Sequence, residues 1–308
     1  MSRRRRRGRP ITGVLVLDKP AGLTSNAALQ RVKQLYFAAK AGHTGSLDPM
    51  ATGVLPLCFG EATRFSQILL DADKRYRCTV LLGQRTTTGD AEGEVLEQID
   101  ASGLNAEVVA RALEGFRGPI EQVPPMYSAI KKDGQPLYEL ARQGLEVERE
   151  ARSVVIHELE LEDFRPGQTA ELDLRVHCSK GTYVRTLAED LGAALGCGGH
   201  VVALRRTGAG PFDEGDCVSL DQLEALHGQR DFAVMAELLL PVEAMLEELP
   251  EVRVVESSGH YLRQGQPVLV PRAPTSGRVC LKLESGELLG MGEILDDGRV
   301  APRRLIGP

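Results

Sequence analysis

The chain alternates between segments with strand periodicity and segments with helical periodicity, but not in the regular order of a βαβ protein. Apolar side chains occupy every second position in residues 75–83 and 171–178, which predicts strands with one buried face. Residues 24–36 and 180–196 have helical spacing instead, the first with Ser25 as its expected N-cap and the second closed by a glycine. This mixture favours an α+β fold with a central mixed or antiparallel sheet.

The spacing of turn residues changes near Pro250 and predicts two domains. Residues 11–250 are expected to form the main domain, with an insert near residues 115–150. Residues 251–308 contain short apolar runs separated by turns, which predicts a small all-β domain. Residues 1–10 hold six arginines and are expected to form a basic tail.

Composition excludes several classes of protein. No apolar run approaches the ~20 residues of a membrane span. No apolar segment of signal-peptide length follows the basic start, so a cytoplasmic protein is expected. The six cysteines lack a Cys-x-x-Cys pair and are interpreted as thiols in a reducing compartment. A metal site is not expected. The best candidate ligands are His177, Cys178, Cys197 and His200, and the first two are strand neighbours that point to opposite faces.

Charge is unevenly distributed along the chain. The formal net charge is −6, yet residues 1–100 carry 15 Lys and Arg against 10 Asp and Glu. Residues 207–250 hold ten carboxylates and one base, whereas residues 251–308 hold eight bases and seven acids. This asymmetry indicates a polyanion bound by the first third of the chain and by its C-terminal region, although a solvated surface is the commoner origin of any one cluster.

The segment of residues 42–55 reads GHTGSLDPMATGVL and contains a single carboxylate, Asp48. It lacks the Gly-Lys-Ser/Thr ending of a phosphate-binding P-loop. It also lacks the second carboxylate of a glycosidase, since the next acid along the chain is Glu61. One carboxylate suits covalent or single-site chemistry. The alternative is that Asp48 only begins an Asp-Pro turn.

Five segments and the C-terminal tail carry a family resemblance. The segments are GVLVLDKPAGLTS (13–25), GHTGSLDPMATGVLPLCFGEAT (42–63), DKRYRCTVLLGQRTTTGDAEG (73–93), QVPPMYSAIKKDGQPLYELARQG (122–144) and HCSKGTYVRTLAEDLG (177–192). In this order they resemble the TruB family, the bacterial tRNA pseudouridine-55 synthases. The tail GRVAPRRL (298–305) is similar to the end of the PUA domain that closes these enzymes. Residues 207–250 add little to the resemblance.

The resemblance implies a pseudouridine synthase fold followed by a PUA-type RNA-binding domain. It implies isomerisation of uridine 55 in the T-loop of tRNA, in which the N-glycosidic bond breaks, the flipped uracil rotates and C5 rejoins the ribose. The family needs no cofactor and no metal for this reaction. The implied partner is the T-arm of tRNA, and a monomer without a membrane or an obligate protein partner is expected.

The resemblance also assigns three catalytic residues. Asp48 matches the catalytic aspartate, which attacks the base, attacks the ribose or removes a ribose proton. Arg185 matches an arginine that pairs with this carboxylate, the alternative being a helix ion pair with Glu189. Tyr76 matches a tyrosine that stacks on the target uracil, whereas its place in an apolar strand face would by itself indicate core packing.

Further matches concern substrate binding. His43 corresponds to a histidine that stacks where the uridine leaves, the alternative being a histidine in a turn bonded to backbone. Lys131 is expected to contact a phosphate or only solvent. Tyr183 and Leu204 match residues of the pocket wall. Asp90 matches an acid of the site without an assigned role. Three glycines of the loop are expected to let backbone approach a ribose or phosphate: Gly42, Gly45 and Gly53.

Two other classes of function stay open at this point. One is a tRNA-binding or tRNA-folding chaperone in which catalysis is secondary. The other is an RNA-guided pseudouridine synthase of the archaeal and eukaryotic branch, which the compact tail and the lack of long Lys-rich ends disfavour. The N-terminal arginines either contact RNA or form a solubilising tail, and RNA contact would make binding strongly salt-dependent.

Overall fold

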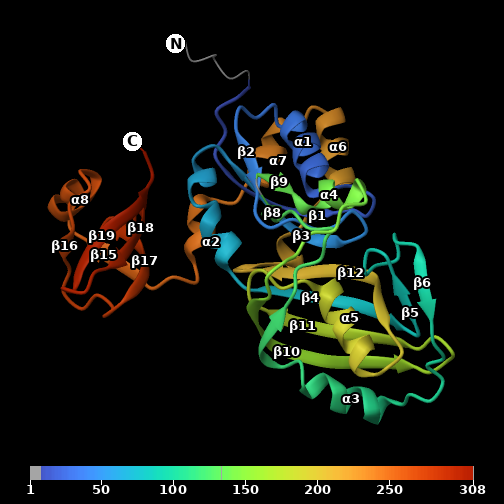
Figure 1. The fold of residues 1–308 in the computed structure, drawn as a ribbon. Helices are drawn as coiled ribbons and strands as arrows, with labels where there is room; N and C mark the ends of the chain where they lie inside the picture. Colours follow the sequence, from blue (N-terminus) through green and yellow to red (C-terminus); the bar gives the residue numbers. More distant parts are fainter. Residues whose placement is uncertain (1–7, 133, 308) are drawn as a thin grey trace. The chain divides into compact units, whose positions relative to one another are not determined.

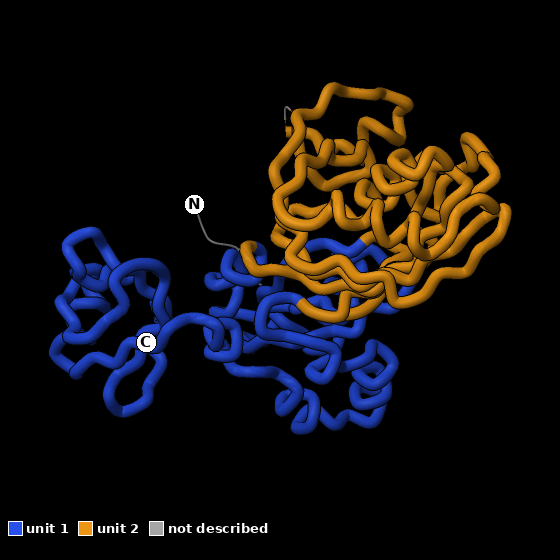
Figure 2. Tube along the Cα trace, turned by 90° about the horizontal axis from the view of Figure 1, so that it is seen from below, with its two compact units in different colours: residues 1–47, 54–70, 209–308 blue, residues 48–53, 71–208 orange. Residues whose placement is uncertain are grey.

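The computed structural model describes residues 8–132 and 134–307, and Figure 1 shows their fold. Residue contacts divide the chain into two compact units, which Figure 2 colours separately. The first unit is made of Met1–Leu47, Val54–Leu70 and Ala209–Pro308, and the second of Asp48–Gly53 and Asp71–Gly208. Most of the predicted basic tail, residues 1–7, lies outside the described residues.

The N-terminal part of the first unit combines helices with paired strands. Strand β1 pairs in parallel with β14, and β2 pairs antiparallel with β3, whose first two residues belong to the second unit. The elements are β1 (Gly13–Lys19), α1 (Ser25–Leu35), β2 (Ala41–His43), β3 (Thr52–Phe59), η1 (Gly60–Arg64), α2 (Ser66–Asp71), β13 (Phe212–Asp213), η2 (Glu214–Asp216), β14 (Val218–Ser219), α6 (Leu220–Gly228), α7 (Phe232–Glu237) and η3 (Val242–Leu246).

Helix α1 begins one residue earlier than its sequence suggests. Thr24 is the N-cap, and its hydroxyl accepts a hydrogen bond from the Ala27 amide at 3.1 Å. Ser25, the expected cap, is buried instead. Its hydroxyl donates to the Leu47 carbonyl at 3.1 Å and accepts from the Leu47 amide at 2.7 Å. Ser25 therefore fixes the backbone of the residue that directly precedes Asp48.

The C-terminal part of the first unit is a five-stranded sheet with the order β15-β17-β18-β19-β16. Its elements are β15 (Glu251–Val254), α8 (Glu256–Arg263), β16 (Val268–Leu269), β17 (Gly277–Leu283), β18 (Leu288–Ile294) and β19 (Arg299–Leu305). The predicted short strands are confirmed. Helix α8 was not predicted, and it packs Leu262 into the apolar core that the strands share.

The second unit is built on a sheet with the order β12-β4-β11-β10-β7. Strands β4 and β11, β11 and β10, and β10 and β7 pair antiparallel. The elements are β4 (Lys74–Leu82), β5 (Gln84–Thr86), β6 (Val95–Gln98), α3 (Ala106–Glu114), β7 (Gly118–Gln122), β8 (Lys131–Lys132), β9 (Gln135–Pro136), α4 (Leu137–Arg142), β10 (Arg152–Arg165), β11 (Glu171–Cys178), α5 (Val184–Ala194) and β12 (Gly199–Ala209). A mixed α and β chain with a large sheet confirms the predicted fold class.

The periodicity of β4 and β11 is confirmed by their burial. Tyr76, Cys78 and Leu82 of β4 are buried, whereas Arg75 and Arg77 between them are exposed. The insert expected near residues 115–150 starts with β7, which is a strand of the main sheet, and continues into the small β8–β9 hairpin and α4.

The described part of the chain has free cysteines, no group of metal ligands and no membrane-spanning helix. Five cysteines are buried and Cys217 is half-buried, all as thiols. Among residues 8–132 and 134–307, no three His, Cys, Asp or Glu side chains form a group that could hold a metal ion. None of the helices in the described chain is both long and apolar enough to cross a membrane.

Gly53 is required by the packing of the chain against itself. It has a φ of +99°, and a Cβ at this position would lie 2.2 Å from the carbonyl oxygen of Arg206 in β12. We expect Gly53→Ala to lower the free energy of unfolding by about 2 kcal/mol or more, because left-handed backbone alone costs roughly 1–2 kcal/mol. Urea unfolding followed by circular dichroism measures this change.

Gly42 provides the matched control. A Cβ there would meet no atom within 4 Å, and its φ is not in the left-handed region. Gly42→Ala should therefore change the free energy of unfolding by less than about 0.5 kcal/mol. Equal losses in the two variants would contradict this account of Gly53.

Candidate active site

The start of helix α5 is held by a side chain from strand β7. Its N-cap, Tyr183, has extended backbone and no side-chain capping bond. Gln122, at the end of β7 and 2% exposed, clamps the Tyr183 backbone instead. Its amide nitrogen donates to the Tyr183 carbonyl at 3.2 Å, and its amide oxygen accepts from the Tyr183 N–H at 3.0 Å. This clamp fixes the direction in which Arg185, two residues later, leaves the helix.

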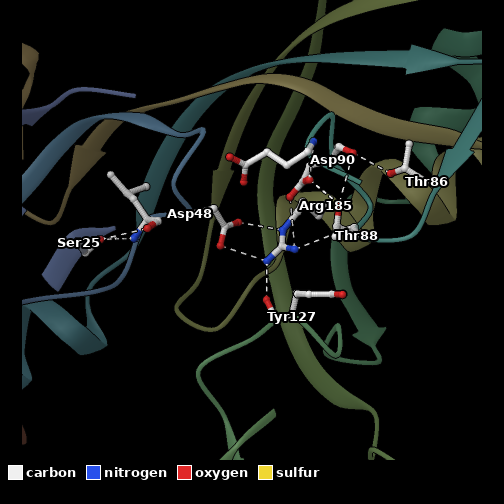
Figure 3. A network of polar contacts seen from close by, with 9 residues as sticks. Ser25, Asp48, Thr86, Thr88, Asp90, Tyr127 and Arg185 are labelled. Carbon is white, nitrogen blue, oxygen red and sulfur yellow. Dashed lines mark hydrogen bonds and ion pairs between the residues drawn. The ribbon is translucent and has the colours of Figure 1, made fainter. Parts of the chain in front are cut away.

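The Arg185 guanidinium lies between two carboxylates and two main-chain carbonyls (Figure 3). Its Nε is 2.8 Å from Asp48 Oδ2, and its Nη2 donates to Asp48 Oδ1 at 3.1 Å. Nη2 also donates to the Tyr127 carbonyl at 2.8 Å. Nη1 donates to the Thr88 carbonyl at 2.9 Å and lies 3.5 Å from Asp90 Oδ2. All three nitrogens of the side chain thus have oxygen partners.

The predicted pairing of Arg185 with Asp48 is therefore observed as a two-point contact. Arg185 forms its ion pairs with Asp48 and Asp90, and the described chain contains no ion pair between Arg185 and Glu189. Burial raises the pKa of Glu189, and the positive charge of Arg185 opposes this shift. The alternative of an i,i+4 helix pair is wrong, because α5 turns Arg185 toward oxygens that are distant in sequence.

Asp48 also begins the turn that its sequence predicts. The Ala51 amide donates to the Asp48 carbonyl at 3.1 Å, which closes a four-residue turn with proline at its second position. The turn and the ion pair are compatible, because the turn uses the main chain of Asp48 and the pair uses its side chain. A local turn and a tertiary contact together determine where this carboxylate points.

The two carboxylates of the site differ in exposure. The side chain of Asp48 is 35% exposed, whereas those of Asp90 and Arg185 are 4% and 5% exposed. A neighbouring cation favours the ionised form of a carboxylate. Arg185 contacts both oxygens of Asp48 but does not cover the group, so Asp48 is the carboxylate that a ligand can reach.

Asp90 is held by its own loop. Its Oδ1 accepts from the Thr88 hydroxyl at 2.5 Å and from the Glu92 amide at 3.1 Å. The loop is joined to β12 by the Ala91 amide, which donates to the Val201 carbonyl, and by the Val201 amide, which donates to the Gly89 carbonyl. Asp90 therefore faces Arg185 from a fixed backbone.

Tyr76 extends this site along β4. It is 9% exposed, and burial raises the pKa of its phenol. Arg206, which is 1% exposed, opposes that shift through its positive charge and a hydrogen bond to the phenol, while the charge of Asp48 adds to it. The phenol is thus neutral at ordinary pH and is electrostatically coupled to Asp48.

The remaining predicted residues are distributed more widely. Burial raises the pKa of Tyr183, which the charges of Arg185 and Asp48 also influence. Leu204 is buried in β12, and Lys131 is exposed in β8. His43 is the last residue of β2, opposite Leu57, so it lies in a strand and not in a turn. Gly45 has a φ of +81°.

Three contributors to the site were not predicted from sequence. Thr88 and Tyr127 supply carbonyl oxygens to Arg185, and any residue type could do so. Arg206 is the largest fully buried side chain of the described chain. Tyr127 does lie within the segment QVPPMYSAIK, which the family resemblance includes.

The geometry suits single-carboxylate chemistry. A carboxylate with an accessible face, oriented by a buried cation, can attack a carbon or accept a proton. The buried partners of Arg185 preorganise this carboxylate before any ligand arrives, so reorientation does not add to the barrier of the reaction.

Comparison with known proteins places this site in a family. Residues 33–184 match the model of the TruB family pseudouridylate synthase N-terminal domain. Residues 185–247 match a tRNA pseudouridylate synthase B C-terminal domain, and residues 250–306 match a C-terminal domain of pseudouridine synthase II TruB. The described site residues from Asp48 to Arg185 fall almost entirely within the first of these matches.

Curated relatives and solved structures agree with these matches. The chain is 54% identical to tRNA pseudouridine synthase B of Saccharophagus degradans, with 99% of each chain covered. It is 56% identical to that of Nitrosococcus oceani, with 98% of this chain and 97% of the relative covered. A solved Cbf5-Nop10-Gar1 complex contains a chain with 27% identity and a TM-score of 0.75, covering 96% of this chain and 85% of that one. The chain belongs to the TruB family of pseudouridine synthases.

Proposed function

We propose that this protein converts uridine 55 in the T-loop of tRNA to pseudouridine. The observation that carries the proposal is the accessible carboxylate of Asp48, gripped at both oxygens by a buried arginine in a chain of this family. Relatives more than 50% identical over nearly the whole chain bear the name tRNA pseudouridine synthase B, which supports tRNA as the substrate class. The T-loop and position 55 come from the family resemblance of the sequence.

In the proposed reaction Asp48 acts on the flipped nucleotide. The bond between N1 and C1′ breaks, the uracil rotates, and a bond forms between C5 and C1′. The proton that leaves C5 is matched by the proton that N1 gains, so substrate and product are isomers. No redox step is involved, and the residues at hand act by attack, proton transfer and orientation.

Tyr76 and Tyr183 are proposed to hold the extruded base. A neutral aromatic ring offers a face on which uracil stacks, and stacking is worth about 1–3 kcal/mol per base. The charge of Asp48 contributes to the raised pKa of the Tyr76 phenol, which supports a position of this ring near the carboxylate. Leu204 is assigned to the apolar wall of the same pocket.

Lys131 is proposed to contact a phosphate of the RNA. It lines a pocket of about 240 Å³ together with three other bases and two acids of the insert. The bases are Lys131, Lys132, Arg149 and Arg152. These four cations outnumber the two carboxylates of the lining, Glu148 and Glu150, so the pocket attracts the RNA backbone without selecting its sequence.

The partner and the place of action follow from the substrate. We expect the T-arm of tRNA to be the part that the protein contacts, and we expect it to act as a monomer. We expect the protein to act in the cytoplasm, because bacteria make tRNA there. Size-exclusion chromatography with light scattering, in the absence and presence of a T-arm hairpin, measures the molar mass and so tests the expected monomeric state.

The first test concerns Asp48. We expect Asp48→Asn to bind tRNA but to form pseudouridine at least about a thousandfold more slowly, because an amide neither attacks nor accepts the proton. Binding is measured by filter retention, and product by mass spectrometry of digested tRNA. Asp100→Asn, a change of an exposed acid in a loop, is the control. Turnover of Asp48→Asn within about tenfold of the parent would remove Asp48 from the reaction.

The second test concerns Arg185. Its removal leaves the buried Asp90 carboxylate without this cation and two carbonyls without this donor, so we expect Arg185→Ala to lower the free energy of unfolding by about 3–5 kcal/mol. Pseudouridine formation should be lost as well. The control, Glu189→Gln on the same helix, should cost less than about 1 kcal/mol. A change under about 0.5 kcal/mol for Arg185→Ala, with activity kept, would contradict this assignment.

The third test concerns His43, proposed to enter the T-loop as the uridine leaves its stack. Flipping a nucleotide costs a few kcal/mol, which a ring in the vacated space offsets in part. His43→Ala should therefore slow the single-turnover rate more on a structured T-arm hairpin than on a hairpin with weakened tertiary stacking. His227→Ala, on helix α6, is the matched control. Equal defects on both hairpins would assign His43 to the chemical step or to support of the loop.

A further inference from the structure

Three consecutive threonines, Thr86, Thr87 and Thr88, precede Asp90 and alternate in direction. The Thr86 hydroxyl donates to the Asp90 carbonyl at 2.8 Å, and the Thr88 hydroxyl donates to the Asp90 carboxylate at 2.5 Å. The Thr87 hydroxyl instead accepts from the Glu94 amide at 3.1 Å, and Thr87 is exposed. Two of the three hydroxyls thus converge on one acid.

Thr88 contacts Arg185 through its carbonyl and Asp90 through its hydroxyl. Its carbonyl accepts from Nη1 at 2.9 Å, while its hydroxyl occupies Oδ1 of Asp90. The other oxygen of Asp90, Oδ2, lies 3.5 Å from the same Nη1 (Figure 3). Thr88 therefore determines both where the guanidinium sits and which oxygen of Asp90 faces it.

The distances decide which carboxylate holds Arg185 more tightly. Asp48 makes two contacts of 2.8 and 3.1 Å, whereas Asp90 makes one of 3.5 Å. A buried carboxylate with a vacant acceptor position turns toward the nearest cation, because burial makes an unmet charge costly. On Asp90, Oδ1 accepts from the Thr88 hydroxyl at 2.5 Å and from the Glu92 amide at 3.1 Å, and the shorter of these bonds is the one to Thr88. The Thr88 hydroxyl thus helps to hold Asp90 back and leaves Nε and Nη2 of Arg185 to Asp48.

We propose that Thr88 is a positioning residue that keeps Arg185 directed at Asp48 by restraining Asp90. The assignment rests on the proposed pseudouridine synthase activity. Thr88 acts through Asp90 and Arg185 and does not touch the nucleotide, so its loss should slow the chemical step and leave RNA affinity unchanged. The Thr86 hydroxyl supports Asp90 only at its main-chain carbonyl, so Thr86 has a secondary role.

Three single variants test this role in the full-length protein. Thr88→Val keeps the shape and removes the hydroxyl, Thr88→Ser keeps the hydroxyl, and Thr87→Val is the matched control. Single-turnover formation of pseudouridine and the Kd for a T-arm hairpin are measured for each. We expect Thr88→Val to slow the rate about tenfold or more with Kd unchanged. The variant removes a hydrogen bond to a charged carboxylate, and such a bond is stronger than one between neutral groups. Thr88→Ser and Thr87→Val should stay near the parent rate.

A double variant asks whether the hydroxyl acts through Asp90. In an Asp90→Asn background the further change Thr88→Val should have much less effect on the rate than it has in the parent. Additive effects, a parent-like rate for Thr88→Val, or an equal loss for Thr88→Ser and Thr88→Val would each overturn the proposal.

Measuring pseudouridine formation by the parent protein distinguishes a failure of this proposal from a failure of the proposed function. If the parent forms no pseudouridine in tRNA, the proposed function fails, and the same cycle of Thr88→Val and Asp90→Asn is then measured by urea unfolding. Non-additive changes in the free energy of unfolding would still support the coupling of Thr88 to Asp90. Additive changes would overturn it.

Discussion

The organisation of the site depends on one buried cation, the guanidinium of Arg185. A charge removed from water is costly unless oxygens replace its hydration, and here two carboxylates and two carbonyls do so. A guanidinium has five N–H donors in one plane, so the arginine also sets the angles between its partners. A lysine would offer three donors from one point and could not satisfy the same set.

Strand and helix positions were well predicted from the sequence where burial is one-sided. Strands β4 and β11 alternate between buried and exposed side chains, and this period identified the face that carries Tyr76. The predicted N-cap of α1, Ser25, was wrong, because the preceding Thr24 is also a good cap and takes this role. Tertiary contact decided between them, since Leu47 uses the hydroxyl of Ser25.

The site itself was only partly predictable, for a physical reason. Asp48 and Arg185 act through their side chains, so the sequence records them as residue types. Thr88 and Tyr127 serve Arg185 through carbonyl oxygens, which every residue carries. Arg206 was missed because an arginine in a strand pattern usually indicates an exposed face, whereas this one is buried beside the phenol of Tyr76.

The pairing of Asp48 with Arg185 spans 137 positions of the chain. At roughly 5–20 residues per second, the ribosome releases the arginine on the order of ten seconds after the aspartate. During that interval helix α5 has not been made, so the Asp48 carboxylate cannot yet pair with Arg185. Such long-range contacts form late in folding because loop closure must precede them. A nascent or truncated chain can thus contain all of residues 42–55 and still lack the contact that orients the Asp48 carboxylate.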